Sequence, residues 1–110
     1  MKLIDLQPRF LQLSDETSTW HCVDDIAKAD GIVFLCPLCF RNKGLTPVGV
    51  HSIICWQPHV PVELGPKPGR WQFVGTGYSD LTLKAGSSSV LLLGGCKAHF
   101  FVTGGTINFC

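Results

Sequence analysis

The chain has 110 residues, of which 45% are hydrophobic and 15% are charged, and its formal net charge is +1 at pH 7. This length allows one modest core, so we expect a single domain that spans residues 1–110. The small net charge argues against a broad electrostatic surface for nucleic acid or for a membrane. The high apolar content predicts either an unusually apolar core or a surface that a protein partner covers.

The N-terminal half contains the one predicted helix. Residues 3–13 look extended, and Pro8 within them favours an edge strand or a bend. A short helix is expected over residues 24–31, with Asp24 as its cap and Gly31 at its end. Residues 32–36 are apolar and rich in β-forming side chains, which predicts a buried strand that leads into the first cysteine motif.

The next segments predict a strand and then a long loop. Residues 48–57 read as a strand in which Gly49, His51, Ile53 and Cys55 share one face. Residues 58–69 contain four prolines and two glycines, so they predict an irregular loop and not a central strand.

The C-terminal half predicts short strands separated by glycine-rich turns. Strands are expected at residues 71–74, 81–83 and 90–93, with a turn at 75–80. Gly104-Gly105 joins two further β-forming runs and supplies the positive φ angles of a primed hairpin turn. The sequence therefore predicts a mainly β fold, a small antiparallel β domain made of two sheets or one curled sheet, with one short helix.

Two cysteine-containing motifs are the chemically most specific part of the sequence. Cys36 and Cys39 form a C-x2-C pair, and after fifty-six residues Cys96 and His99 form a C-x2-H pair. Three thiolates and one imidazole fill a tetrahedron, which suits Zn²⁺ and leaves no open position. We therefore expect one structural zinc ion, bound by Cys36, Cys39, Cys96 and His99, that clasps the domain.

Two other interpretations of these motifs remain open. They could be unrelated pairs of buried residues, or they could form two disulfides. A disulfide between Cys36 and Cys39 is typical of redox sites in which a helix begins at the motif. Pro37 and residues 40–44 instead favour a knuckle that runs into a turn.

Other histidines and cysteines are candidates for a second metal site or a catalytic cluster. They are His21 beside Cys22, His51 and Cys55 on one strand face, and His59. His51 and Cys55 are four residues apart on a strand, about 13 Å by the usual rise, which is too far to share one ion directly. Packing between neighbouring strands is therefore the preferred interpretation of these two residues.

The motifs and several neighbouring segments occur together in one family. These segments are residues 36–39, Leu45-Thr46-Pro47, the tryptophans Trp56 and Trp71, and residues 81–90 and 96–107. Over residues 32–109 the chain resembles a family of small zinc-knuckle proteins found in bacteria and their phages. The resemblance implies metal binding and no particular activity, and many members have more cysteines in the first knuckle. The architecture is also similar to the β-tent group, in which zinc holds two antiparallel sheets together at one end.

The expected location follows from cysteine usage and apolar runs. Six cysteines without an N-terminal apolar signal segment indicate a reducing compartment. The apolar runs, such as residues 90–93, are far too short to span a bilayer. We expect a cytoplasmic protein, located in the host cytoplasm or in the virion if a phage encodes it.

Three classes of function are compatible with these features. The first is a binding or assembly module, such as a phage structural or accessory protein. The second is a metal-dependent or thiol-based enzyme that uses Cys22, Cys55 or Cys110. The third, a nucleic-acid-binding zinc protein, ranks last because the lysines and arginines are scattered.

We favour the first class, a binding or assembly module that acts through protein–protein contacts and not by catalysis. A closed zinc shell offers no position for an activated water, so we expect no catalytic residues. The apolar excess predicts a homo-oligomer or a stable complex with a protein partner. Its expected contact surfaces are the loop 58–69 and the exposed face of the closing hairpin, with the side chains Val60, Val62, Leu64 and Phe101. The three tryptophans are expected in the core: Trp20, Trp56 and Trp71.

Overall fold

Antiparallel strands account for most of the fold. The computed structural model describes residues 1–13, 20–42, 50–60, 70–84, 89–91 and 99–109. A four-stranded sheet has the order β2-β1-β3-β4 and consists of β1 (Arg9–Leu13), β2 (Trp20–Val23), β3 (Gly31–Leu35) and β4 (Ser52–Trp56). The two smaller sheets are β5-β6 and β7-β8-β9, formed by β5 (Gln72–Val74), β6 (Thr82–Lys84), β7 (Ser89–Leu91), β8 (His99–Thr103) and β9 (Thr106–Phe109). All these strand pairs are antiparallel, which confirms the predicted mainly β fold.

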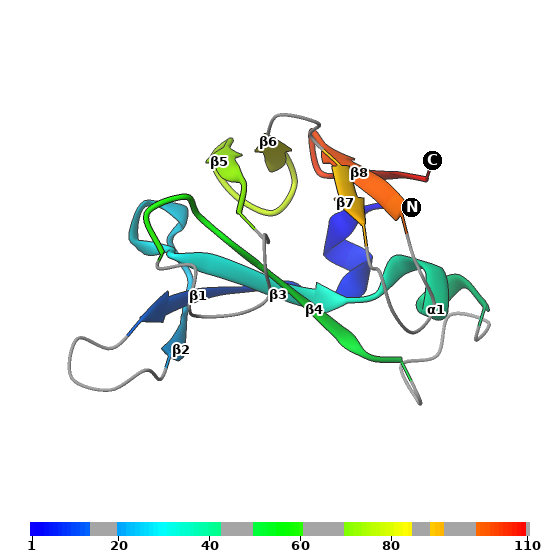
Figure 1. Cartoon of the computed structure of the whole chain (residues 1–110), viewed down its shortest axis with the longest axis horizontal. Helices are drawn as coiled ribbons and strands as arrows, with labels where there is room; N and C mark the ends of the chain where they lie inside the picture. Colours follow the sequence, from blue (N-terminus) through cyan, green and yellow to red (C-terminus); the bar gives the residue numbers. More distant parts are fainter. Residues whose placement is uncertain (14–19, 43–49, 61–69, 85–88, 92–98, 110) are drawn as a thin grey trace.

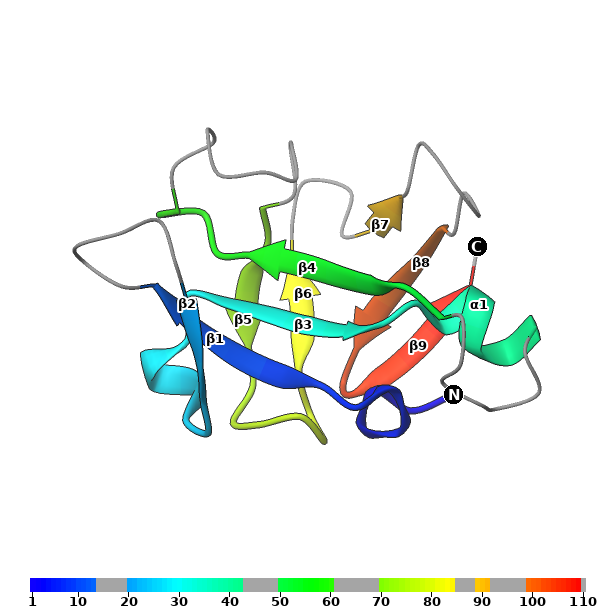
Figure 2. The same ribbon diagram turned by 90° about the horizontal axis from the view of Figure 1, so that it is seen from below.

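The three sheets are arranged in two layers. The four-stranded sheet forms one layer, and both smaller sheets lie on the same side of it (Figure 1). The strands of the smaller sheets run across the direction of β1, β3 and β4 (Figure 2). Strand β6 contacts β8, so the smaller sheets lie side by side and together cover one face of the large sheet.

Side-chain alternation in β3 and β4 builds the main core between these layers. Ile32 pairs with Cys55, and Phe34 pairs with Ile53. Residues two apart on a strand share a face, so these four side chains point the same way, and all four are buried. They pack in one cluster with the other main core residues, which are Leu3, Leu6, Phe10, Ala29, Cys36, Phe40, Leu81, Leu83, Phe100, Val102 and Ile107.

A smaller apolar cluster lies on the opposite face of the four-stranded sheet. Leu11, Trp56 and Val60 are its buried members. Trp20 meets Trp56 edge to face, with ring centroids 5.7 Å apart, but remains 44% exposed. Two expectations are therefore wrong, because Trp20 is not a core residue and Val60 is buried instead of available to a partner. Val62 and Leu64, in the same expected contact loop, lie outside the described residues. Trp71 is partly buried against the main core.

The last hairpin has the predicted turn and is joined to the beginning of the chain. Gly104 and Gly105 have φ angles of 55° and 75°, as a primed turn requires. The backbone N–H of Leu3 donates to the carbonyl oxygen of Gly105 at 2.8 Å, and that of Ile107 donates to the carbonyl of Met1 at 2.8 Å. The N-terminal residues thus lie beside this hairpin.

The helical segments differ from the prediction. The 3₁₀ helix η2 (Ile26–Lys28) replaces the longer helix expected over residues 24–31. Asp25, and not Asp24, caps it, because the Asp25 side chain accepts a hydrogen bond from the Ala27 N–H at 2.9 Å. The chain is already extended at Ala29, and Gly31 begins β3, so the predicted helix end is also wrong.

Pro8 does not mark an edge strand. It follows the 3₁₀ helix η1 (Leu3–Leu6) and directly precedes β1. Strand β1 lies inside the sheet, between β2 and β3. Because Pro8 lies outside the strand, its missing N–H removes no hydrogen bond from the ladder.

Candidate metal centre

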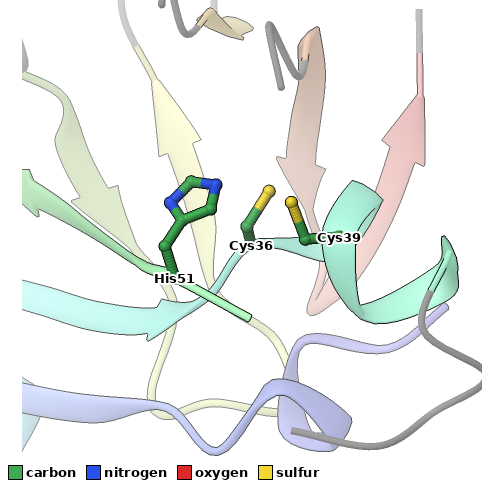
Figure 3. Close-up of side chains that lie close together, drawn as sticks. All are labelled: Cys36, Cys39 and His51. Carbon is green, nitrogen blue, oxygen red and sulfur yellow. The ribbon is translucent and has the colours of Figure 1, made fainter. Parts of the chain in front are cut away.

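Three side chains that can bind a metal ion meet at one end of the four-stranded sheet. Cys36 directly follows β3, Cys39 lies in the helix α1 (Pro37–Asn42), and His51 directly precedes β4. Their ligand atoms all lie within 4.8 Å of one another. The two thiols and the imidazole point toward a common space (Figure 3). This Cys-Cys-His cluster could hold a metal ion.

The pairing of β3 with β4 places His51 beside Cys36. The last pair of the ladder is Leu35 with Ser52. One step further, the Cys36 N–H donates to the His51 carbonyl oxygen at 2.9 Å, so the antiparallel register continues by one pair. Residues directly opposite each other on antiparallel strands have Cβ atoms about 5 Å apart and side chains on the same face. His51 is therefore a cross-strand neighbour of Cys36.

The start of α1 places Cys39 beside Cys36. The Cys36 carbonyl accepts the first intrahelical hydrogen bond, from the Phe40 N–H at 2.9 Å, so Cys36 is the N-cap and Cys39 is the third helical residue. Pro37 is suited to the first helical position, where no N–H is needed. Because an N-cap side chain reaches toward the second and third helical residues, the two thiols become neighbours. The expectation that the motif runs into a turn is wrong, since a helix begins there.

The three side chains differ in their exposure to solvent. Cys36 is fully buried and belongs to the main core. Cys39 is partly exposed, and His51 is exposed. The cluster therefore lies at the boundary between the core and the solvent, and it is accessible from the side of Cys39 and His51.

Aromatic contacts connect these elements to the three-stranded sheet. Phe34, two residues before Cys36, meets Phe100 edge to face, with ring centroids 6.1 Å apart. The guanidinium of Arg41 in α1 lies 4.2 Å from the centre of the Phe109 ring in β9. The cluster thus lies at the end of the molecule where α1 and the β8–β9 hairpin approach the large sheet (Figures 1 and 2).

The four predicted ligands have different outcomes. Cys36 and Cys39 are brought together as expected. Cys96 lies outside the described residues. His99 begins β8 and is exposed, and it is not part of the cluster, in which His51 provides the imidazole. Phe100 and Val102 point into the core, so by strand alternation His99 faces the other way. Metal binding by Cys96 remains a prediction.

The remaining candidates for a second site do not gather into a metal-binding group of three in the described residues. Within the described parts of the chain, no other group of three metal-binding side chains is present. The His21 ring nitrogen contacts the Gln12 side-chain oxygen at 3.2 Å, and His59 contacts Asp30 at 2.7 Å. Burial raises the pKa of the Cys55 thiol, which keeps it protonated in the core. Cys22 is exposed on β2.

Comparison of the chain with models of known protein families, with curated proteins and with solved structures finds no match. In the part of the chain that the structure describes, no helix is long and apolar enough to cross a membrane.

Proposed function

We propose that the chain is a zinc-binding β domain that acts by contact, as a binding or assembly module. The observation that carries the proposal is the convergence of Cys36, Cys39 and His51, whose ligand atoms lie within 4.8 Å of one another. Two thiolates and an imidazole form a donor set that Zn²⁺ prefers. Among the described residues, no carboxylate belongs to this cluster, which argues against calcium or magnesium.

The position of the cluster supports a structural role. A zinc ion bound there would join the end of β3, the first turn of α1 and the start of β4. It would also fix the position of α1, from which Arg41 reaches Phe109 in the three-stranded sheet. In a small domain, metal binding supplies folding free energy directly, because the unfolded chain has no preformed site.

A structural zinc site has four protein ligands, so the proposal requires one more. Cys96, from the predicted second motif, remains our candidate for it. Cobalt substitution tests this assignment, because thiolate-to-cobalt charge-transfer absorption grows with the number of thiolate ligands. We expect three thiolates in the wild-type protein and two in Cys96→Ser. Equal absorption in both proteins would remove Cys96 from the ligand set.

A metal-dependent enzyme is the second candidate function, and one observation favours it. The described cluster provides three ligands, and catalytic zinc sites combine three protein ligands with a water. Azide added to the cobalt-loaded protein distinguishes the two functions. A spectrum that azide leaves unchanged supports a closed, structural shell. A change that saturates with azide supports an open position and hence the enzyme.

Function by contact has its own test. The structure exposes three large apolar side chains, Ile4, Trp20 and Val74, among the described residues. Light scattering of the zinc-loaded protein at several concentrations measures self-association, which we expect. If the protein is a monomer throughout, the assembly role requires a different protein as partner.

A further inference from the structure

Cys36 and Cys39 differ in accessibility although their sulfur atoms are neighbours. Cys36 is fully buried in the main core, whereas Cys39 is partly exposed on α1. Both sulfurs lie inside the 4.8 Å cluster, and they are not joined by a disulfide. A reagent that arrives from the solvent therefore meets Cys39 first, with the thiol of Cys36 directly behind it.

We infer that this pair is a thiol–disulfide switch, at which a low-molecular-weight disulfide oxidises Cys39 and Cys36 and thereby releases the bound metal. The inference rests on the proposed zinc site and adds the regulation of that site. Its co-reactant is a disulfide of the glutathione type, which exchanges with protein thiolates through mixed disulfides.

The reaction consists of two exchange steps. The Cys39 sulfur attacks one sulfur of the small disulfide, so a Cys39 mixed disulfide forms and one small thiolate leaves. The Cys36 sulfur then attacks the Cys39 sulfur, so the Cys36–Cys39 disulfide forms and a second small thiolate leaves. The two cysteines together lose two electrons, and the small disulfide gains them. The zinc ion remains Zn²⁺ throughout and leaves because it has lost two thiolate ligands.

The local geometry favours the second step. Cys36 at the N-cap and Cys39 in the first helical turn have side chains on the same side of the helix start. A disulfide requires Cβ atoms about 3.5–4.5 Å apart, a separation that two residues three apart around a helix start can reach. This is the helix start that the disulfide interpretation of the motif required. Once both sulfurs are lost, only two ligands of the proposed four-ligand shell would remain, His51 and the candidate Cys96, and two ligands are too few for a structural zinc ion.

The other described cysteines provide internal controls. Cys22 is exposed on β2, an edge strand of the four-stranded sheet, whereas Cys55 lies on β4 at the opposite edge and Cys36 and Cys39 lie with His51. We therefore expect Cys22 to form a mixed disulfide that no other described cysteine resolves. Cys55 is fully buried, and burial raises the pKa of its thiol, so it is expected to stay reduced.

The experiment uses the zinc-loaded 110-residue chain, treated with glutathione disulfide in the absence of oxygen. The zinc content is measured first. Zinc release is then followed with a chromogenic chelator, and the disulfides are mapped by mass spectrometry. We expect one zinc released per Cys36–Cys39 disulfide formed, and rebinding after reduction with added zinc. Cys22→Ser is expected to release zinc at the wild-type rate.

Two further variants test the order of attack. In Cys36→Ser the resolving thiol is missing, so we expect a glutathione adduct to accumulate at Cys39. In Cys39→Ser we expect at least tenfold slower labelling of Cys36, because Cys36 is buried. Wild-type protein that holds zinc and keeps it after oxidation would overturn the switch while leaving the zinc site intact. Protein that holds no zinc before glutathione disulfide is added would overturn the zinc site and the switch together.

Discussion

Cys36 and His51 are direct cross-strand neighbours, because the Cys36 N–H donates to the His51 carbonyl at 2.9 Å, one step beyond the last pair of β3 and β4. This relationship gives the cluster its imidazole. It also means that the position of one ligand depends on strand register, since a shift by one residue would turn the His51 side chain to the other face of the sheet.

Metal removal is expected to lower the thermal stability of the domain strongly. Zinc binding contributes on the order of 10 kcal/mol in small zinc modules, and the total stability of a domain is about 5–15 kcal/mol. Circular dichroism melts with and without a chelator measure this effect. Elemental analysis must show that the metal is gone. An unchanged melting temperature in metal-free protein would rule out a structural site.

Gly31→Ala is expected to destabilise the fold by about 1–3 kcal/mol through overpacking. Gly31 pairs with Trp56, and a Cβ at this position would collide with the Trp56 ring and lie 2.9 Å from the Cys55 carbonyl oxygen. Gly77→Ala is the matched control, because a Cβ there meets no atom within 4 Å. Denaturant unfolding of both variants measures the difference. Equal stability of the two variants would contradict the close packing of Trp56 on Gly31.

Asp80 is expected to stabilise the turn at residues 75–80 in a pH-dependent manner. Hydrogen bonds from the Thr76 N–H, the Gly77 N–H and the Thr76 hydroxyl hold the pKa of Asp80 below its usual value. A lowered folded-state pKa means that the unfolded chain binds protons first as the pH falls. The contribution is therefore complete above the unfolded pKa of about 3.9 and disappears as the pH falls through the folded pKa.

The difference in unfolding free energy between the wild type and Asp80→Asn measures this contribution. It should be constant near neutral pH and should shrink in acid. Protonation of the zinc ligands affects both proteins equally, so it cancels in the difference. A difference that does not change with pH would show that the charge of Asp80 is not what stabilises the turn.

Much of the fold could be predicted from local patterns. The apolar run at residues 32–36 predicted the buried strand β3, alternation in residues 48–57 predicted which side chains share a face of β4, and Gly104-Gly105 predicted the last turn. The short helices η2 and α1 were harder to predict, because helices of three and six residues are too short to show a periodic pattern of apolar residues. Pro37 favours a turn but is also a favoured first residue of a helix, so the residue alone does not distinguish the two.

The metal-binding cluster was only partly predictable, because one of its contacts depends on the register between two strands and not on a local pattern. The spacing of Cys36 and Cys39 identified one half of it directly. His51 and Cys55 share a face of one strand, but the distance between these two residues along that strand does not determine whether His51 joins a metal site. His51 approaches Cys36 across the sheet, and that contact follows from the register between two strands. The pairing of Cys36 with His51 could have been found by extending an assumed β3–β4 ladder to its end.

The central claim is that His51, and not His99, provides the imidazole of the zinc site. The zinc content of His51→Ala, compared with that of His99→Ala, tests this claim most directly. Loss of an outer-shell partner of a metal ligand already costs about 10–100-fold in affinity, so we expect at least a hundredfold loss for a ligand itself. The account predicts that His51→Ala loses its zinc in competition with a chelator, whereas His99→Ala and wild type retain one zinc per chain. Full zinc retention by His51→Ala would contradict the account.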